Sequence, residues 1–109
     1  DEEKYEDSKF LFQRNIVYNP KDSESYLYLA KIFKVEEDKV EEEKNIKTSL
    51  LLDPKNEEAM YFLIDLELER SNFSKAKELK EDFVIICSKM CEKLKNIENR
   101  LKAFEKTNS

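Results

Sequence analysis

The sequence contains no glycine, no histidine and no tryptophan, and only two prolines and two cysteines among 109 residues. Without glycine, the Gly-rich loop that cradles phosphates cannot be built. Without histidine, the usual base that activates a Ser or Cys nucleophile is missing. Paired carboxylates are plentiful among the 25 acidic residues, but no pair stands out as an acid and a base in a pocket. We therefore expect a protein that is not an enzyme and needs no cofactor.

The scarcity of glycine and proline also bears on the fold class. Sheets need turn residues and alternating β-branched runs, and this sequence has few of either. Charged residues make up 41% of the chain and apolar residues 39%, which is typical of a helical array. The length suits a single domain with a thin core. We therefore expect an all-α protein formed by one domain, residues 1–109.

The net charge is −5, from 25 acidic and 20 basic residues. This balance argues against an electrostatic grip on a nucleic-acid backbone or on an anionic membrane surface. The longest apolar run, Phe83 to Cys87, has five residues. A membrane span needs roughly 18, so we expect a soluble domain without direct membrane insertion. A cytoplasmic location is slightly favoured. The sequence begins at Asp1, as an excised domain or a processed form would, so a targeting segment upstream would lie outside it.

Cys87 and Cys91 are the only cysteines, and an unbroken helix would place them on one face. Such a helix holds an i, i+4 pair poorly for an intrachain disulfide, so we expect two apolar thiols in or near a core. Two thiolates without histidine or further cysteines do not make a tetrahedral zinc site. We therefore expect no metal site.

A sequence repeat runs through the chain. The similar stretches IVYNPK, LLLDPK and VIICSK begin at Ile16, Leu50 and Val84, so they follow one another at equal intervals. The interval corresponds to a period of about 34 residues, within the range of helical repeat proteins. We therefore expect structural units of this length.

Proline marks the boundary in the first two stretches. Pro20 and Pro54 disfavour the helical conformation in the residue before them, so each predicts the end of a helix. Polar residues that follow, Asp22 and Asn56 among them, can cap the start of the next helix. In the third stretch Ser88 replaces proline, and the compulsory stop is lost.

Between these stretches the apolar residues follow a helical period. The first whole unit has an inward face of Tyr26, Leu29, Ala30 and Phe33, and one period later Met60, Leu63 and Ile64 repeat three of these places. Glu67 takes the fourth place, so Leu66 or Leu68 must help to cover that face. Second helices are predicted at about 40–52 and 74–86. We divide the chain into a half repeat (1–20), two repeats (21–54 and 55–88) and a C-terminal helix (89–109).

This pattern resembles the tetratricopeptide repeat (TPR). The matching residues are Tyr26, Leu29, Ala30, Phe33 and Pro54 in the first unit, and Met60, Leu63, Phe73 and Ala76 in the second. Four positions depart from the family pattern: Glu42 and Ile64 stand where small residues are usual, and Glu37 and Ser71 replace the turn glycine. The resemblance implies an array of antiparallel helix pairs, a TPR-like α-solenoid, with locally altered packing, although the charged end of Glu42 could reach the solvent.

The resemblance also implies a binding surface on the first helix of each unit. A second stripe of these helices would line a concave groove, with Leu27, Tyr28, Lys31, Tyr61, Phe62 and Asp65 as the partner-binding residues. Aromatic side chains suit this role because they offer much contact area for little lost entropy. The alternative is that these residues are further core or are covered by the terminal helix. Lys31 is the only basic residue among them and no Asn appears, so the family's clamp for a chaperone's C-terminal carboxylate is not expected.

The C-terminal segment carries an apolar heptad seam. Its residues include Met90, Leu94, Ile97, Leu101 and Phe104. One interpretation is a continuous helix from about Ser74, whose projecting end would form a coiled coil with another copy or a partner. The other, which we favour, ends a helix near Ser88 and folds the remainder back as a cap on the array.

These observations predict a non-catalytic protein–protein interaction module that binds a peptide or helical segment of a protein partner. The alternative is a structural assembly element that self-associates through the C-terminal seam. The identity of the partner cannot be read from the sequence.

Overall fold

The computed structural model describes residues 2–107, with the side chains of residues 4–105, as six α-helices. The helices are α1 (Glu2–Tyr18), α2 (Ser23–Val35), α3 (Lys39–Leu52), α4 (Glu57–Glu69), α5 (Phe73–Ile86) and α6 (Lys93–Thr107). No strand occurs between residues 2 and 107. The predicted all-α class is confirmed.

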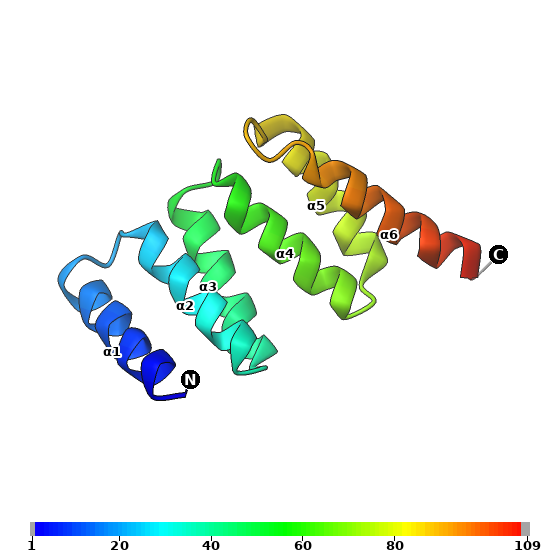
Figure 1. Cartoon of the computed structure of the whole chain (residues 1–109). Coiled ribbons are helices and arrows are strands. Elements are labelled where there is room, and N and C mark those ends of the chain that lie inside the picture. Colours follow the sequence, from blue (N-terminus) through cyan, green and yellow to red (C-terminus); the bar gives the residue numbers. More distant parts are fainter. Residues whose placement is uncertain (1, 108–109) are drawn as a thin grey trace. The chain divides into compact units, whose positions relative to one another are not determined.

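The chain forms two compact units, residues 1–54 with α1 to α3 and residues 55–109 with α4 to α6. In the first unit, α1 and α3 both pack against α2; in the second, α5 and α6 both contact α4 and also each other. Figure 1 shows α2 with α3, and α4 with α5, as antiparallel pairs joined by short turns. The helices fall inside the proposed repeat boundaries, although the division into repeats itself stays a prediction.

Proline ends two helices as predicted. Helix α1 stops at Tyr18 and α3 at Leu52, each two residues before a proline. The start of α4 is capped as expected, since the side-chain oxygen of Asn56 accepts a hydrogen bond from the N–H of Ala59 at 3.1 Å.

Asp22 is the N-cap residue of α2, as predicted, and its carboxylate also joins α1 to α2. It accepts hydrogen bonds from the Ser25 hydroxyl at 2.7 Å and from the Asn15 side-chain amide at 2.9 Å. The bond from Ser25, supported by the one from Asn15, lowers the pKa of Asp22 despite partial desolvation. The end of α1 is thereby fixed to the first turn of α2.

The predicted helical faces form the core except at Tyr26, which stays partly exposed. Buried residues include Leu29, Ala30 and Phe33 of α2, and Met60, Leu63 and Ile64 of α4. The expected gap at Glu67 is closed as predicted, because Leu66 and Leu68 on either side are both buried.

Polar side chains are also buried in these cores: Ser25, Glu42, Asn45, Ser49 and Glu67. Glu42 is only 2% exposed, so its charged end does not reach the solvent as it could have done. The Ser49 hydroxyl donates to the Ser23 carbonyl oxygen at 2.9 Å, and the Glu67 carboxylate accepts from the Asn72 amide at 2.7 Å. Among the described side chains, no buried N or O atom lacks a hydrogen-bond partner. Burial of these groups is therefore offset by hydrogen bonds.

The turns inside both helix pairs use the left-handed backbone conformation without glycine. Glu37 and Ser71, which lie one repeat period apart, both have φ of 61°. After each, the next N–H bonds back to the helix: Asp38 to the Phe33 carbonyl at 2.9 Å, and Asn72 to the Glu67 carbonyl at 2.8 Å. This is the Schellman ending of a helix, whose left-handed position favours glycine. The departure of Glu37 and Ser71 from the repeat pattern therefore leaves the turn intact and makes it strained.

We predict that Ser71→Gly raises the free energy of unfolding by about 1 kcal/mol, because glycine adopts φ of 61° without the Cβ clash. Ser74→Gly is the matched control: Ser74 lies in the first turn of α5, where the same change should lower stability by roughly 0.5–1 kcal/mol. Urea unfolding followed by far-UV circular dichroism measures both. Equal destabilisation by the two changes would show that the turn carries no such strain.

Candidate functional site

In the first unit, an aromatic patch surrounds Tyr28 of α2. The ring of Phe12 from α1 stacks on Tyr28 with centroids 4.9 Å apart and planes 14° apart. The Lys31 ammonium nitrogen lies 4.8 Å from the centroid of the Tyr28 ring. Tyr28 remains 45% exposed. We call Phe12, Tyr28 and Lys31 the Tyr28 patch; it offers a flat apolar ring with a cation held against it.

Leu27, the neighbouring predicted site residue, lies elsewhere. Its side chain is 1% exposed and belongs to the core. A residue that a partner cannot reach contributes to binding only by supporting the helix. Of the two interpretations that the sequence allowed for this position, the structure favours core.

In the second unit, α6 lies against two of the predicted site residues on α4. The Tyr61 hydroxyl donates to the Asn96 side-chain oxygen at 3.2 Å, and the Lys93 ammonium nitrogen lies 5.6 Å from the centroid of the Tyr61 ring. Asp65 pairs with Arg100 at 2.5 Å. Tyr61 and Asp65 therefore position the terminal helix, as the alternative interpretation held, and both remain partly exposed.

Phe62 completes this face of α4 and is also partly exposed. Its ring centroid lies 6.4 Å from that of Tyr61 at a tilt of 56°. Sequence reasoning missed the three residues that α6 adds here, Lys93, Asn96 and Arg100. Their spacing of three and four residues marks one edge of a helix beside the apolar seam, and this signal could have identified them.

The turn between α5 and α6 is held by Glu57, in the first turn of α4. Its carboxylate accepts hydrogen bonds from the backbone N–H groups of Ser88, Lys89 and Met90 at 2.6 to 3.2 Å, and from the Ser88 hydroxyl at 2.9 Å. Consecutive N–H groups that converge in this way form an anion-binding nest, here filled by the protein's own carboxylate. The chain therefore turns at Ser88 without proline, and the favoured fold-back of the C-terminal helix is confirmed.

The cysteines at this turn are bonded, so the prediction of two free thiols was wrong. Cys87 and Cys91 form a disulfide, with Cα atoms 5.3 Å apart. The prediction assumed an unbroken helix, but Cys87 has extended backbone angles (φ −66°, ψ 145°) and ends α5. Leaving the helix brings the two Cα atoms within disulfide range.

The nest changes the acidity of Glu57. Desolvation alone would raise the pKa of this carboxyl, but the N–H groups of Ser88, Lys89 and Met90 and the Ser88 hydroxyl prevail and lower it to about 2. The ordinary value is 4.5. Glu57 therefore stays ionised well into the acid range while α6 is docked.

The C-terminal seam packs inside the second unit. Ile97 and Leu101 are buried, the ring of Phe104 stacks on Phe73 with centroids 3.7 Å apart, and Met90 and Leu94 are partly buried. Because α5 ends at Ile86, the seam faces the α4–α5 pair instead of projecting from it. The seam is thus occupied within the chain, and assembly through it would require α6 to detach.

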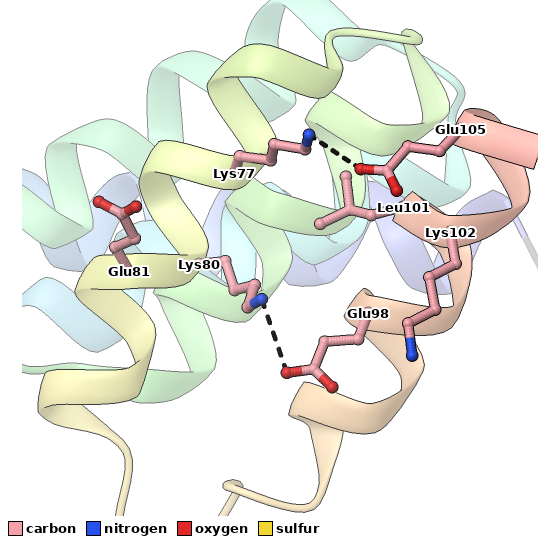
Figure 2. A pocket seen from close by; sticks show the side chains of 7 residues that line it. All are labelled: Lys77, Lys80, Glu81, Glu98, Leu101, Lys102 and Glu105. Carbon is pink, nitrogen blue, oxygen red and sulfur yellow. Dashed lines mark ion pairs between the residues drawn. The ribbon is translucent and has the colours of Figure 1, made fainter. Parts of the chain in front are cut away.

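A cleft runs between α5 and α6 (Figure 2). Its walls are tied by two ion pairs, Lys77 with Glu105 at 3.0 Å and Lys80 with Glu98 at 3.5 Å, above Leu101. A charged ligand would have to break these pairs to enter. We interpret the cleft as part of the α5–α6 contact.

Among the residues that the structure describes, no group of three or more Cys, Asp or Glu residues is arranged to hold a metal ion. No helix in the same part is both long and apolar enough to cross a membrane.

No protein-family model and no curated protein sequence matches the chain. Solved structures do. One is the type III secretion translocator chaperone SycD of Yersinia enterocolitica. The match covers 98% of this chain and 76% of the SycD chain, with a TM-score of 0.80 and 16% identity. The structure of SycD in complex with a peptide of the translocator YopD covers 99% of this chain and 85% of the SycD chain, with a TM-score of 0.81 and 16% identity. The likeness supports a TPR-like helical-repeat fold for this chain.

We predict that Leu101→Asp lowers the free energy of unfolding by about 3 kcal/mol or more, because it places a carboxyl group in the core beneath α6. Lys102→Asp, on the exposed side of the same helix, should cost only about 0.5 kcal/mol. Urea unfolding gives the stability, and sedimentation velocity gives the mass. If Leu101→Asp instead left stability unchanged and dissociated an oligomer, the seam would be an interface between chains.

We predict that stability falls as the pH drops from 4.5 towards 2, partly because Glu57 becomes protonated. Its folded pKa of about 2 lies below the unfolded value, so its contribution is complete above pH 4.5 and is lost on acidification. Glu57→Gln should therefore show a smaller loss of stability between pH 7 and pH 3 than the wild type. Glu81→Gln, an exposed carboxylate on α5, should keep the wild-type loss. An unchanged pH dependence in Glu57→Gln would contradict the role of the nest.

Proposed function

We propose that this chain is a non-catalytic module of the tetratricopeptide-repeat type that binds a peptide or helical segment of a protein partner. The observation that carries the proposal is the Tyr28 patch, a partly exposed aromatic ring that stacks on Phe12 and has the Lys31 ammonium over it. A ring already held by stacking loses little entropy when a ligand covers it. The patch is therefore prepared for contact with an apolar side chain.

Support for the class of ligand comes from the solved structures. The SycD complex contains a peptide of the translocator YopD, so a chain of this fold is able to take a peptide as its ligand. The backbone of a peptide partner would form hydrogen bonds with water, and its apolar side chains would pack against the aromatic rings.

The chemistry of the chain supports a role without catalysis. It contains no histidine and no glycine, both cysteines are in a disulfide, and the carboxylate of Glu57, whose pKa is lowered to about 2, is occupied by backbone N–H groups. An acyl- or phosphoryl-transfer site would require a nucleophile with a base in reach, and none of these groups supplies that pair.

In the second unit we assign partner binding chiefly to Phe62, with Tyr61 and Asp65 at its side. Tyr61 and Asp65 already hold Asn96 and Arg100 of α6, so removing them would disturb the terminal helix as well as any ligand. Phe62 is the probe in this unit because its side chain is partly exposed and its ring lies beside that of Tyr61. Leu27 is left out of the binding set because it is buried.

The test uses a random peptide library displayed on phage and selected on the intact domain. For the peptides recovered, Tyr28→Ala should weaken binding at least tenfold, which is about 1.4 kcal/mol, because the stacked ring is lost. Isothermal titration calorimetry measures the affinity, and circular dichroism verifies that the variant keeps its helices.

Tyr18→Ala is the matched control, since Tyr18 is the same residue type, more exposed, and outside the patch. It should bind the selected peptides as the wild type does. Phe62→Ala extends the test to the second unit. If Tyr28→Ala and Phe62→Ala both bind like the wild type, the proposed surface is wrong.

A further inference from the structure

Helix α1 contacts α2 along one side only. On that side the Lys9 ammonium nitrogen lies 5.4 Å from the centroid of the Phe33 ring and 3.1 Å from the Glu36 carboxylate, Phe12 stacks on Tyr28, and Asn15 bonds Ser25 at 2.6 Å. These residues recur every three or four positions, as one face of a helix requires. The opposite side of α1 therefore points away from the first unit's core.

That opposite side is apolar with two charges. It consists of Asp7, Phe10, Leu11, Arg14, Val17 and Tyr18, which we call the α1 outer face. Its four large apolar side chains are between 59% and 78% exposed. Phe10, Arg14, Val17 and Tyr18, with Gln13, also line a shallow depression. An exposed apolar strip of this kind indicates a docking surface.

We propose that the α1 outer face binds the same face of a second copy, with the two helices antiparallel. This inference goes beyond the proposed peptide binding, does not depend on it, and uses a different surface from the C-terminal seam. The order of the residues along α1 supports this arrangement. A two-fold axis between Phe10 and Leu11 places Asp7 of each copy opposite Arg14 of the other and packs Phe10 against Leu11 at the centre.

The same axis gives the ends of the helix complementary neighbours. Val17 and Tyr18 of one copy come opposite the region of Lys4 of the second copy, where the lysine can lie over the tyrosine ring. A parallel arrangement would instead set Asp7 against Asp7 and Arg14 against Arg14, two repulsive pairs on a short helix. The charges thus select the antiparallel register.

The interface is small, so the association should be weak. Helix α1 has 17 residues and is about 25 Å long. One face of such a helix buries less than the roughly 1,200 Å² that standard interfaces reach. We expect a monomer–dimer equilibrium that is visible from about 10 µM to about 1 mM.

The test is charge complementation, measured by sedimentation equilibrium on the full chain over that concentration range. Asp7→Arg alone and Arg14→Asp alone each turn two attractive pairs into repulsive ones, so each variant should self-associate at least tenfold more weakly than the wild type. An equimolar mixture of the two variants restores both pairs and should associate as strongly as the wild type. Raising the salt concentration should weaken the wild-type dimer and strengthen self-association of the single variants.

Two controls keep the result specific. Lys21→Asp makes the same charge change as Arg14→Asp in an exposed turn outside the face and should leave the dimer unchanged. Phe10→Ser should abolish dimerisation without lowering the helix content, because Phe10 is exposed in the single chain. A wild type that stays monomeric to about 1 mM, or a mixture no stronger than the single variants, would overturn the proposal.

Discussion

A pair of amphipathic helices cannot bury apolar residues on both of its sides by itself, and each unit is organised by this constraint. In the second unit α6 supplies the missing cover, and Ile97 and Leu101 become core when it folds back onto α4 and α5. In the first unit α1 covers α2 in the same way. The two covering helices differ on their outer sides: α6 turns a charged side outward, whereas α1 turns out Phe10 and Val17.

The fold-back of α6 needs a stop at the end of α5, and two different devices make such stops in this chain. Pro20 and Pro54 enforce the first two through local sterics. The third stop is a long-range contact, in which Glu57 gathers the N–H groups of a turn that lies far along the chain. A proline stop can be read directly from the sequence, whereas the Glu57 stop forms only once α4 and α5 have packed together.

This difference explains which features the sequence predicted. Composition led to the all-α class, Pro20 and Pro54 led to the helix ends near them, and the helical period led to the core positions of Leu29 and Leu63. The pattern could not say whether Leu27 or Tyr28 of the same stripe would be accessible, because that depends on the angle at which α1 and α3 pack on α2. The disulfide was missed for a related reason: an i, i+4 spacing has one meaning inside a helix and another across its end.

The bond between Cys87 and Cys91 joins residues only four positions apart, so it restricts the unfolded chain little and acts locally on the turn. The turn is therefore closed twice, once by a covalent bond that exists only under oxidising conditions and once by a carboxylate that is insensitive to redox state. The carboxylate holds the turn against α4, and the disulfide ties the residues before α6 to the end of α5. The docking of α6 through Glu57 therefore does not depend on the redox state of Cys87 and Cys91.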